Sequence, residues 1–313
     1  MMSPPWLPCS STFSRLGLHS VRRWLLAAGA LLTASALAGQ PAPMPGASRL
    51  SQELTLSHSF SPSGDLERNG KVGEVKIAQS SVAYFLSVPI TPELRGLAGI
   101  FHTYTSLDST GPVPLPDRLQ LWGVSLGATR TLAKAFGPGW SSTLMLRPYL
   151  SSDSSGLGDA GFSVPASLSL GYRQSPALTW NFGLNVNAQS DNPVLPILGA
   201  RWDFAPAWTL AFGFPQTGLS YQASSALTLK AGARFQGGTY HVSTARAAGL
   251  GDTWLEYRDI RLGAGFDYQI GKILIASLDG GVVIDRKFDY FDRNYDLDGK
   301  SVGYLTVSLR ARF

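Results

Sequence analysis

The feature that most constrains the fold is a strict alternation of apolar and polar residues, repeated in long segments from Leu50 to the last residue. In IRLGAGFDYQI, residues 260–270, Ile, Leu, Ala, Phe, Tyr and Ile alternate with Arg, Gly, Gly, Asp and Gln. ALTWNFGLNVNAQ (177–189) and ALTLKAGARFQ (226–236) repeat the pattern. A period of two predicts β-strands with one apolar and one polar face.

The length and composition of the two faces indicate a membrane as the surrounding solvent. Each apolar face extends over about ten residues, as in a strand that crosses the hydrocarbon layer at a tilt. The opposite faces carry Gly, Asn, Thr and charged residues, which suit a watery lumen. No stretch reaches the roughly 18 apolar residues of a membrane-spanning helix. We therefore predict an all-β, closed antiparallel transmembrane β-barrel.

The segments and their turn signals predict about fourteen strands, or twelve if the short pair around Phe214-Pro215 folds inside the barrel. An even number leaves both ends of the barrel on the periplasmic side. The expected ranges are 50–60, 72–88, 94–105, 118–132, 140–151, 162–173, 177–189, 197–204, 207–214, 218–223, 226–242, 253–270, 272–287 and 300–313.

The connections alternate between short and long, as short periplasmic turns and long outer loops do in such barrels. The short ones include 175–176, 205–206, 224–225 and 271–272; the longer ones are 61–71, 106–117, 152–161, 190–196, 243–252 and 288–299. Aromatic residues gather near the short turns and predict an inner girdle at the lipid–water boundary: Trp140, Trp180, Trp202, Trp208 and Tyr221.

The N-terminal segment reads as a secretory signal. Arg22 and Arg23 precede an apolar core at 24–34 and the small-residue end SALAGQ, with cleavage expected after Ala38 and export by the Sec machinery. Residues 39–49 are then a Pro/Ala/Gly-rich periplasmic linker, and 50–313 form the barrel.

Removing this leader changes the charge and cysteine content. The net charge falls from 26 − 21 = +5 to 23 − 21 = +2, so the basic balance gives no support to nucleic-acid binding. Cys9 leaves with the leader, which excludes disulfide and thiol chemistry in the mature chain.

The last residues form a separate signal. Phe313 ends the chain, and Leu309 and Leu305 precede it at the same strand parity. A terminal Phe after alternating apolar residues is the pattern by which the barrel assembly machinery recognises its clients. We therefore expect this machinery, together with outer-membrane lipid and lipopolysaccharide, as the partners of the chain; its oligomeric state stays open.

The stretch LPILGARWDFAPAWTLAFGFPQTGLSYQASSALTL, residues 195–229, resembles a family of uncharacterised bacterial outer-membrane β-barrel proteins that carry a domain of unknown function. The segment WLEYRDIRLGAGFDYQI and the closing hairpin are also similar to that family. The resemblance implies a barrel in the outer membrane of a Gram-negative bacterium. It implies no functional residues, because the family has no assigned activity.

Two polar clusters are candidate chemical sites. His241 and Ser243 lie two apart on one strand face near the outer rim, with Glu256 at matching parity, as a lipid A deacylase-like hydrolase requires. Gly237-Gly238 can reverse that parity through a bulge. The run Asp292, Asn294, Asp296 and Asp298 places oxygens at alternate positions but lacks the distal Glu of a calcium loop, so we predict no metal site and no cofactor.

The remaining candidates are charged residues on lumen-facing positions. Rings of fixed charge select ions in pores, whereas charges that pair across a plugged lumen hold a barrel together. These observations predict a passive porin-like channel or a structural barrel without catalytic activity; a lipid hydrolase that uses Ser243 and His241, and a surface receptor or adhesion barrel, are the alternatives. The residues proposed to set selectivity are Lys230, Arg234, Arg201, Asp203, Arg261 and Asp267, with Arg147, Arg173 and Glu53 beside them.

Overall fold

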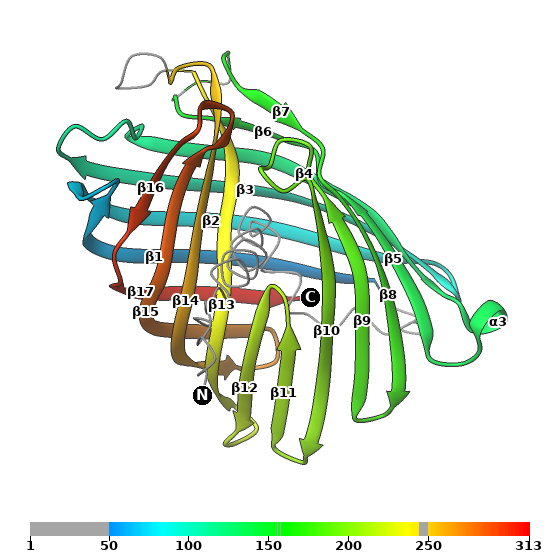
Figure 1. Ribbon diagram of the computed structural model, residues 1–313. Coiled ribbons are helices and arrows are strands. Elements are labelled where there is room, and N and C mark those ends of the chain that lie inside the picture. The colour runs from blue at the N-terminus through cyan, green and yellow to red at the C-terminus, as the bar shows by residue number, and fades with distance from the viewer. Residues whose placement is uncertain (1–49, 155, 157, 244–249) are drawn as a thin grey trace, which may run out of the picture.

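A computed structural model describes residues 50–154, 156, 158–243 and 250–313 of the protein as one closed, antiparallel β-barrel (Figure 1). The predicted signal peptide and linker lie outside the described residues. The strands are β1 (Ser51–Glu67), β2 (Lys71–Thr91), β3 (Leu94–Thr110), β4 (Arg118–Thr131), β5 (Trp140–Leu146), β6 (Tyr149–Ser152), β7 (Gly161–Ser163), β8 (Ala166–Ser175), β9 (Leu178–Val186), β10 (Val194–Ala205), β11 (Trp208–Gly213), β12 (Gln216–Gln222), β13 (Leu227–Val242), β14 (Thr253–Ile270), β15 (Leu274–Tyr290), β16 (Tyr295–Gly299) and β17 (Val302–Arg312).

These elements form fourteen wall strands, because three wall strands are interrupted. β5 and β6 both pair with β4, β7 and β8 pair with β6 and β5, and β16 and β17 both pair with β15 and β1. The barrel closes where β1 pairs with β17, from Glu53 opposite Arg312 to Phe60 opposite Leu305. The fourteen-strand prediction is confirmed. The twelve-strand alternative is wrong, because β11 and β12 pair with β10 and β13 inside the wall.

The two faces of each strand follow the sequence alternation. On β14, Leu262, Phe266 and Ile270 point outward and are exposed, whereas Arg261 and Asp267 point into the lumen. On β17 the exposed outward residues are Leu305, Val307 and Leu309. An outward apolar band is the surface that hydrocarbon requires, since a closed ring of strands leaves no edge unpaired within it.

The end of the barrel that carries the short connections is here called the turn end, and the opposite end the loop end. Aromatic rings cluster at the turn end: Trp140 stacks on Tyr172 at 4.7 Å between centroids and Trp208 lies 4.6 Å from Tyr221. The four-residue helix α3 (Ala133–Phe136) also lies there, and its Lys134 holds the pKa of Glu93 below its ordinary value through a 2.7 Å ion pair. No helix among the described residues is long and apolar enough to span a membrane.

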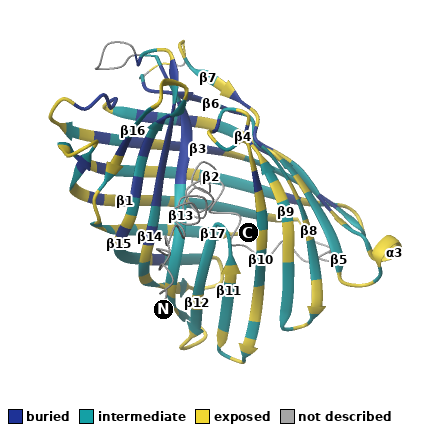
Figure 2. Ribbon diagram, in the orientation of Figure 1, coloured by how far each residue is buried: buried dark blue, intermediate teal, exposed yellow. Residues whose placement is uncertain are grey.

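The strands near the chain ends run further toward the loop end than the sequence predicts. β1 ends at Glu67, β3 at Thr110 and β15 at Tyr290, and part of the expected 288–299 loop is the strand β16. The inward side chains of these extensions pack into one apolar core at the loop end (Figure 2). Its members include Leu66, Val75, Ile77, Leu107, Leu119, Leu121, Tyr240, Leu255, Tyr257, Phe288, Tyr290 and Leu297.

The connection from β3 to β4 adds to this core from within. Its residues Val113 and Leu115 are buried in the cluster, and the Tyr290 hydroxyl donates a hydrogen bond to the backbone carbonyl of Pro114. Segments that the alternation suggested were solvated loops therefore close the loop end. Each Å² of apolar surface that these segments bury stabilises the fold by about 25 cal/mol, which favours extended, packed strands over solvated loops.

The wall carries a gap in strand pairing on the side of β11 and β12, which are shorter than their neighbours (Figure 1). β11 pairs with β10 only at residues 199–205, and β12 pairs with β13 only at 228–234. No strand of the described chain therefore lies between residues 194–198 of β10 and 235–242 of β13. At the tip of the β11–β12 hairpin these two strands are three strand spacings apart, about 14 Å.

Candidate functional site

The lumen is the candidate site, because it gathers the charged side chains that the outer wall excludes. Among the described residues, twice as many basic as acidic side chains point inward by strand register. The ten basic residues are Arg95, Arg147, Arg173, Arg201, Lys230, Arg234, Arg261, Arg286, Arg310 and Arg312. The five acidic residues are Glu53, Asp203, Asp259, Asp267 and Asp279. The lumen thus carries an excess of positive charge.

All six predicted selectivity residues face the lumen, and five of them are in ion pairs. Lys230 lies 2.6 Å from Asp267 and 3.5 Å from Asp279, so one ammonium bridges two carboxylates on β14 and β15. Arg201 lies 3.0 Å from Asp203 on β10. Pairing is the arrangement expected of the structural-barrel alternative, and the role of these residues in selectivity stays a prediction.

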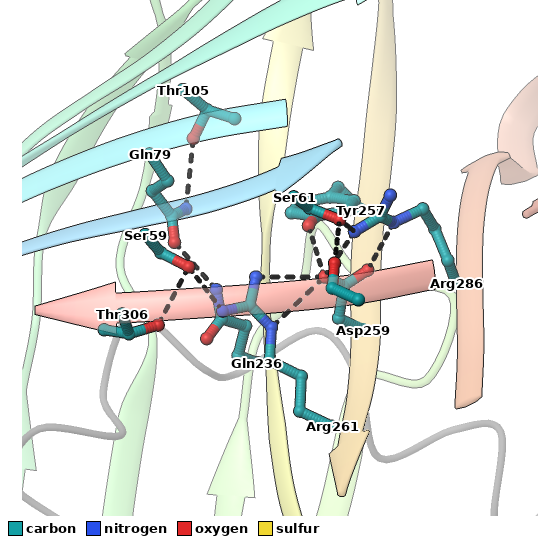
Figure 3. Close-up of polar contacts among 11 residues, drawn as sticks. Ser59, Ser61, Gln79, Thr105, Gln236, Tyr257, Asp259, Arg261, Arg286 and Thr306 are labelled. Atoms are coloured by element: carbon teal, nitrogen blue, oxygen red, sulfur yellow. Dashed lines mark hydrogen bonds and ion pairs between the residues drawn. The ribbon is translucent and has the colours of Figure 1, made fainter. Parts of the chain in front are cut away.

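Arg261 belongs to a larger buried network that lies next to the loop-end core (Figure 3). Asp259 is fully buried and accepts hydrogen bonds from Arg286 Nε at 2.9 Å, Arg261 Nη2 at 3.1 Å and the Tyr257 hydroxyl at 2.7 Å. Arg261 also donates to Ser59 Oγ at 2.7 Å. Two guanidinium groups therefore share one carboxylate, which leaves one net positive charge in a dry environment.

Two further hydrogen bonds join strands from different parts of the wall close to the Asp259 network. Gln236 on β13 donates to Gln79 on β2 at 2.8 Å, and Gln79 donates to Thr105 on β3 at 3.0 Å (Figure 3). These contacts link strands from the two ends of the chain across the interior. The polar layer and the apolar core beyond it fill the loop end of the barrel between β1–β3 and β13–β15.

At the turn end the charges surround the entrance to the lumen. Glu53 on β1 lies 2.9 Å from Arg312 and 3.8 Å from Arg310 on β17, across the seam where the barrel closes. On another part of the wall, the Thr209 hydroxyl donates to Asp203 at 2.5 Å. These groups are partly exposed, so water reaches them and screens their interactions.

The margins of the pairing gap combine aromatic and polar contacts. At its lower margin, the rings of Phe214 and Phe235 meet at 5.1 Å, and the backbone amide of Phe235 donates to the Pro215 carbonyl at 3.0 Å. At its upper margin, the connection from β9 to β10 reaches β14, where the Ser190 hydroxyl donates to buried Glu256 at 2.9 Å. The gap is thus bounded above and below by chain contacts.

The residues proposed for a hydrolase are not brought together. Ser243 donates to Asp153 at 2.8 Å, whereas the two ring nitrogens of His241 contact the Asp159 carbonyl at 3.0 Å and Asp252 at 3.2 Å. Glu256 faces outward as its parity predicts, but its carboxylate binds Ser190. The side chains therefore do not form the nucleophile–base–acid chain that catalysis of this kind uses.

The acidic run at 292–298 is divided between a loop and a strand. Asp292 accepts a hydrogen bond from Thr253, and Asp296, on β16, lies 3.2 Å from Lys287. Within the described ranges no group of three or more His, Cys, Asp or Glu side chains is placed to hold a metal ion.

The sequence analysis missed Asp259 and Arg286, the most deeply buried charges of the lumen. The sequence does contain a signal for Asp259, because it lies two residues before Arg261 and continues its parity. It contains none for Arg286, since a register shift between β14 and β15 after Ile260 decides which residues of β15 point inward.

Comparison with known proteins adds a family and a fold. A family model described as "Domain of unknown function (DUF6268)" matches residues 95–297. No curated protein matches the chain. Among solved structures, a deltaS2 mutant of the monoaromatic hydrocarbon channel TodX aligns with a TM-score of 0.50 and 11% identity over 87% of this chain and 90% of that one. An outer-membrane channel from Pseudomonas putida F1 aligns with a TM-score of 0.45 and 12% identity over 87% and 100%. At such identities the likeness of the first shows a shared barrel fold.

Proposed function

The chain belongs to the DUF6268 family, and from the charges of its lumen we propose that it is a passive outer-membrane channel that prefers anions. The observation that carries this proposal is the twofold excess of basic over acidic side chains facing the lumen. Fixed charges that line a narrow pore attract ions of opposite sign and repel ions of the same sign. The resemblance of the fold to outer-membrane channels supports the location.

The proposed route does not follow the barrel axis to the end. The apolar core and the Asp259 layer fill the loop end, so a solute that enters at the turn end needs an exit at the side. The pairing gap between β10 and β13 supplies one, at a height where Phe214 and Phe235 line the margin. The TodX variant is named as a monoaromatic hydrocarbon channel, which supports a route with apolar margins.

The test is electrical. The processed full-length barrel is inserted into planar bilayers under a potassium chloride gradient, and the reversal potential reports whether chloride or potassium carries the current. We expect discrete conductance steps and a reversal potential of the sign set by chloride. A folded, heat-modifiable barrel that gives no current above the detergent background refutes the channel; a current carried by potassium refutes the anion preference.

A further inference from the structure

We propose that the inward face of β2–β5 binds a small organic monocarboxylate with an apolar body, and that this patch sets the solute class of the channel. The proposal rests on the proposed channel function. It is drawn from four apolar side chains and two arginines that the register of β2, β3, β4 and β5 places next to one another: Phe85, Leu97, Phe101 and Met145, with Arg147 and Arg95.

The apolar part of the patch is made continuous by inward-facing glycines. A Cβ built on Gly99 would lie 2.5 Å from the ring of Phe85, and one on Gly123 would lie 2.4 Å from the ring of Phe101. At Gly127 the same atom would lie 2.9 Å from the sulfur of Met145. These large side chains therefore lie flat across the neighbouring strands. Phe85, Leu97 and Met145 are half-buried and present apolar surface to the lumen, whereas Phe101 is buried beneath Arg147 at the margin of the loop-end core.

Arg147 marks the edge of the patch nearer the loop end. Its guanidinium carbon lies 4.6 Å from the centre of the Phe101 ring, and its Nε donates to Ser125 Oγ at 3.3 Å. These two contacts fix the plane of the guanidinium beside an aromatic surface. A planar guanidinium is the group that matches a carboxylate, and the half-buried side chains of Phe85, Leu97 and Met145 beside it offer contact to an apolar body.

Arg95 marks the edge nearer the turn end. Its Nε donates to Ser87 Oγ at 3.1 Å, and it lies opposite Thr129 on β4. Ser125, the partner of Arg147, is four residues further along β4, which corresponds to about 13 Å. Leu97 lies in the row between them, and Phe85 lies in the row of Ser125. A carboxylate that enters at the turn end thus meets the level of Arg95 first and that of Arg147 after crossing the row of Leu97.

The strands β9–β13 leave room for such a solute. Glycines occupy inward positions on these five consecutive strands, where the register places Gly183, Gly199, Gly213, Gly218 and Gly232. Bulk is therefore concentrated on one part of the wall. An inorganic anion would use the arginines but not the apolar rows, whereas a neutral hydrocarbon would use the rows but not the arginines; a monocarboxylate with an apolar body uses both.

Isothermal titration of benzoate into the purified barrel in detergent tests the site without requiring a current. We expect saturable binding of benzoate, and binding at least about tenfold weaker for acetate, which lacks the ring, and for benzyl alcohol, which lacks the charge. Arg147→Gln is expected to weaken benzoate binding about tenfold, since a charge-assisted pair is lost. Arg173→Gln, at an inward position of β8 outside the patch, is the matched control.

Leu97→Ser provides a second variant in case Arg147→Gln does not fold, which heat modifiability on a gel reveals. It keeps every charge and is expected to weaken benzoate binding while leaving the weaker binding of acetate unchanged, because acetate has no ring to contact the apolar side chains. Equal binding of benzoate, acetate and benzyl alcohol, or equal losses in Arg147→Gln and Arg173→Gln, would overturn the proposed site. A barrel that conducts chloride but ignores benzoate removes the site and keeps the channel; one that binds benzoate without any current removes the channel and keeps the site.

Discussion

Arg286 donates a hydrogen bond from Nε to Oδ1 of Asp259 over 2.9 Å, and both side chains are almost completely shielded from solvent. The pair joins β14 to β15 next to the loop-end core. Arg261 binds the other carboxylate oxygen of Asp259. The carboxylate therefore offsets the repulsion between the two buried guanidinium groups and accepts hydrogen bonds from both.

Asp259→Asn is expected to destabilise the barrel by about 3–5 kcal/mol, because it leaves two buried cations without a counterion. Urea unfolding in detergent micelles measures the loss. Asp203→Asn is the matched control: its partner Arg201 is 45% exposed, so the change should cost less than about 1 kcal/mol. Equal losses in the two variants would contradict a special role of the buried network.

Lys230→Glu is expected to move the reversal potential toward that of potassium. The substitution replaces a lumen cation that lies 2.6 Å from Asp267 with an anion, so it changes the lumen charge by two. Lys272→Glu makes the same chemical change in the exposed turn between β14 and β15 and should leave the reversal potential near that of the unaltered protein. The two bilayer recordings at one salt gradient decide the matter; indistinguishable shifts would argue against selection by the lumen.

Phe235→Ala is expected to increase the single-channel conductance, because it removes a ring from the lower margin of the pairing gap. Phe266→Ala serves as control, since that ring is 37% exposed on the outer face of β14, which is paired on both sides with β13 and β15. If solutes leave by another route, the two variants will conduct alike.

Phe313→Ser is expected to lower the amount of folded barrel in the outer membrane, because the terminal aromatic residue forms part of the predicted assembly signal. The folded fraction is read from heat-modifiable mobility in isolated membranes. Phe136→Ser removes an equally exposed ring, on α3 at the turn end, and should leave assembly intact. Normal assembly of the Phe313 variant would show that the terminal residue is dispensable.

The alternation of residues predicted the parts of the barrel that lipid constrains. Leu262, Phe266 and Ile270 face outward as expected, because a shift by one residue would turn an entire strand inside out. Outside the lipid this constraint disappears. The extensions of β1 and β15 were therefore read as loops, although their residues Leu66 and Phe288 are buried in a core that only tertiary contacts assemble.

The lumen shows the same division between local and distant information. Lys230 and Asp267 were recognised because each lies on a regular strand whose parity is clear. The contacts of Arg147 with Phe101 and Ser125 join three strands, and no spacing within one segment indicates them. Likewise, His241 and Ser243 lie close in sequence, yet the loops around them supply each with a different acidic neighbour.

Apart from Tyr149, the buried members of the loop-end core come from two ranges of the chain, Leu66 to Leu121 and Tyr240 to Leu297. Those are also the regions that flank the junction of β1 with β17. The core is therefore built from contacts between residues far apart in the sequence, which form slowly because a long loop must close before they are made. The core thus joins the first hairpins of the barrel to the last ones, and removing either group would expose the apolar side chains of the other.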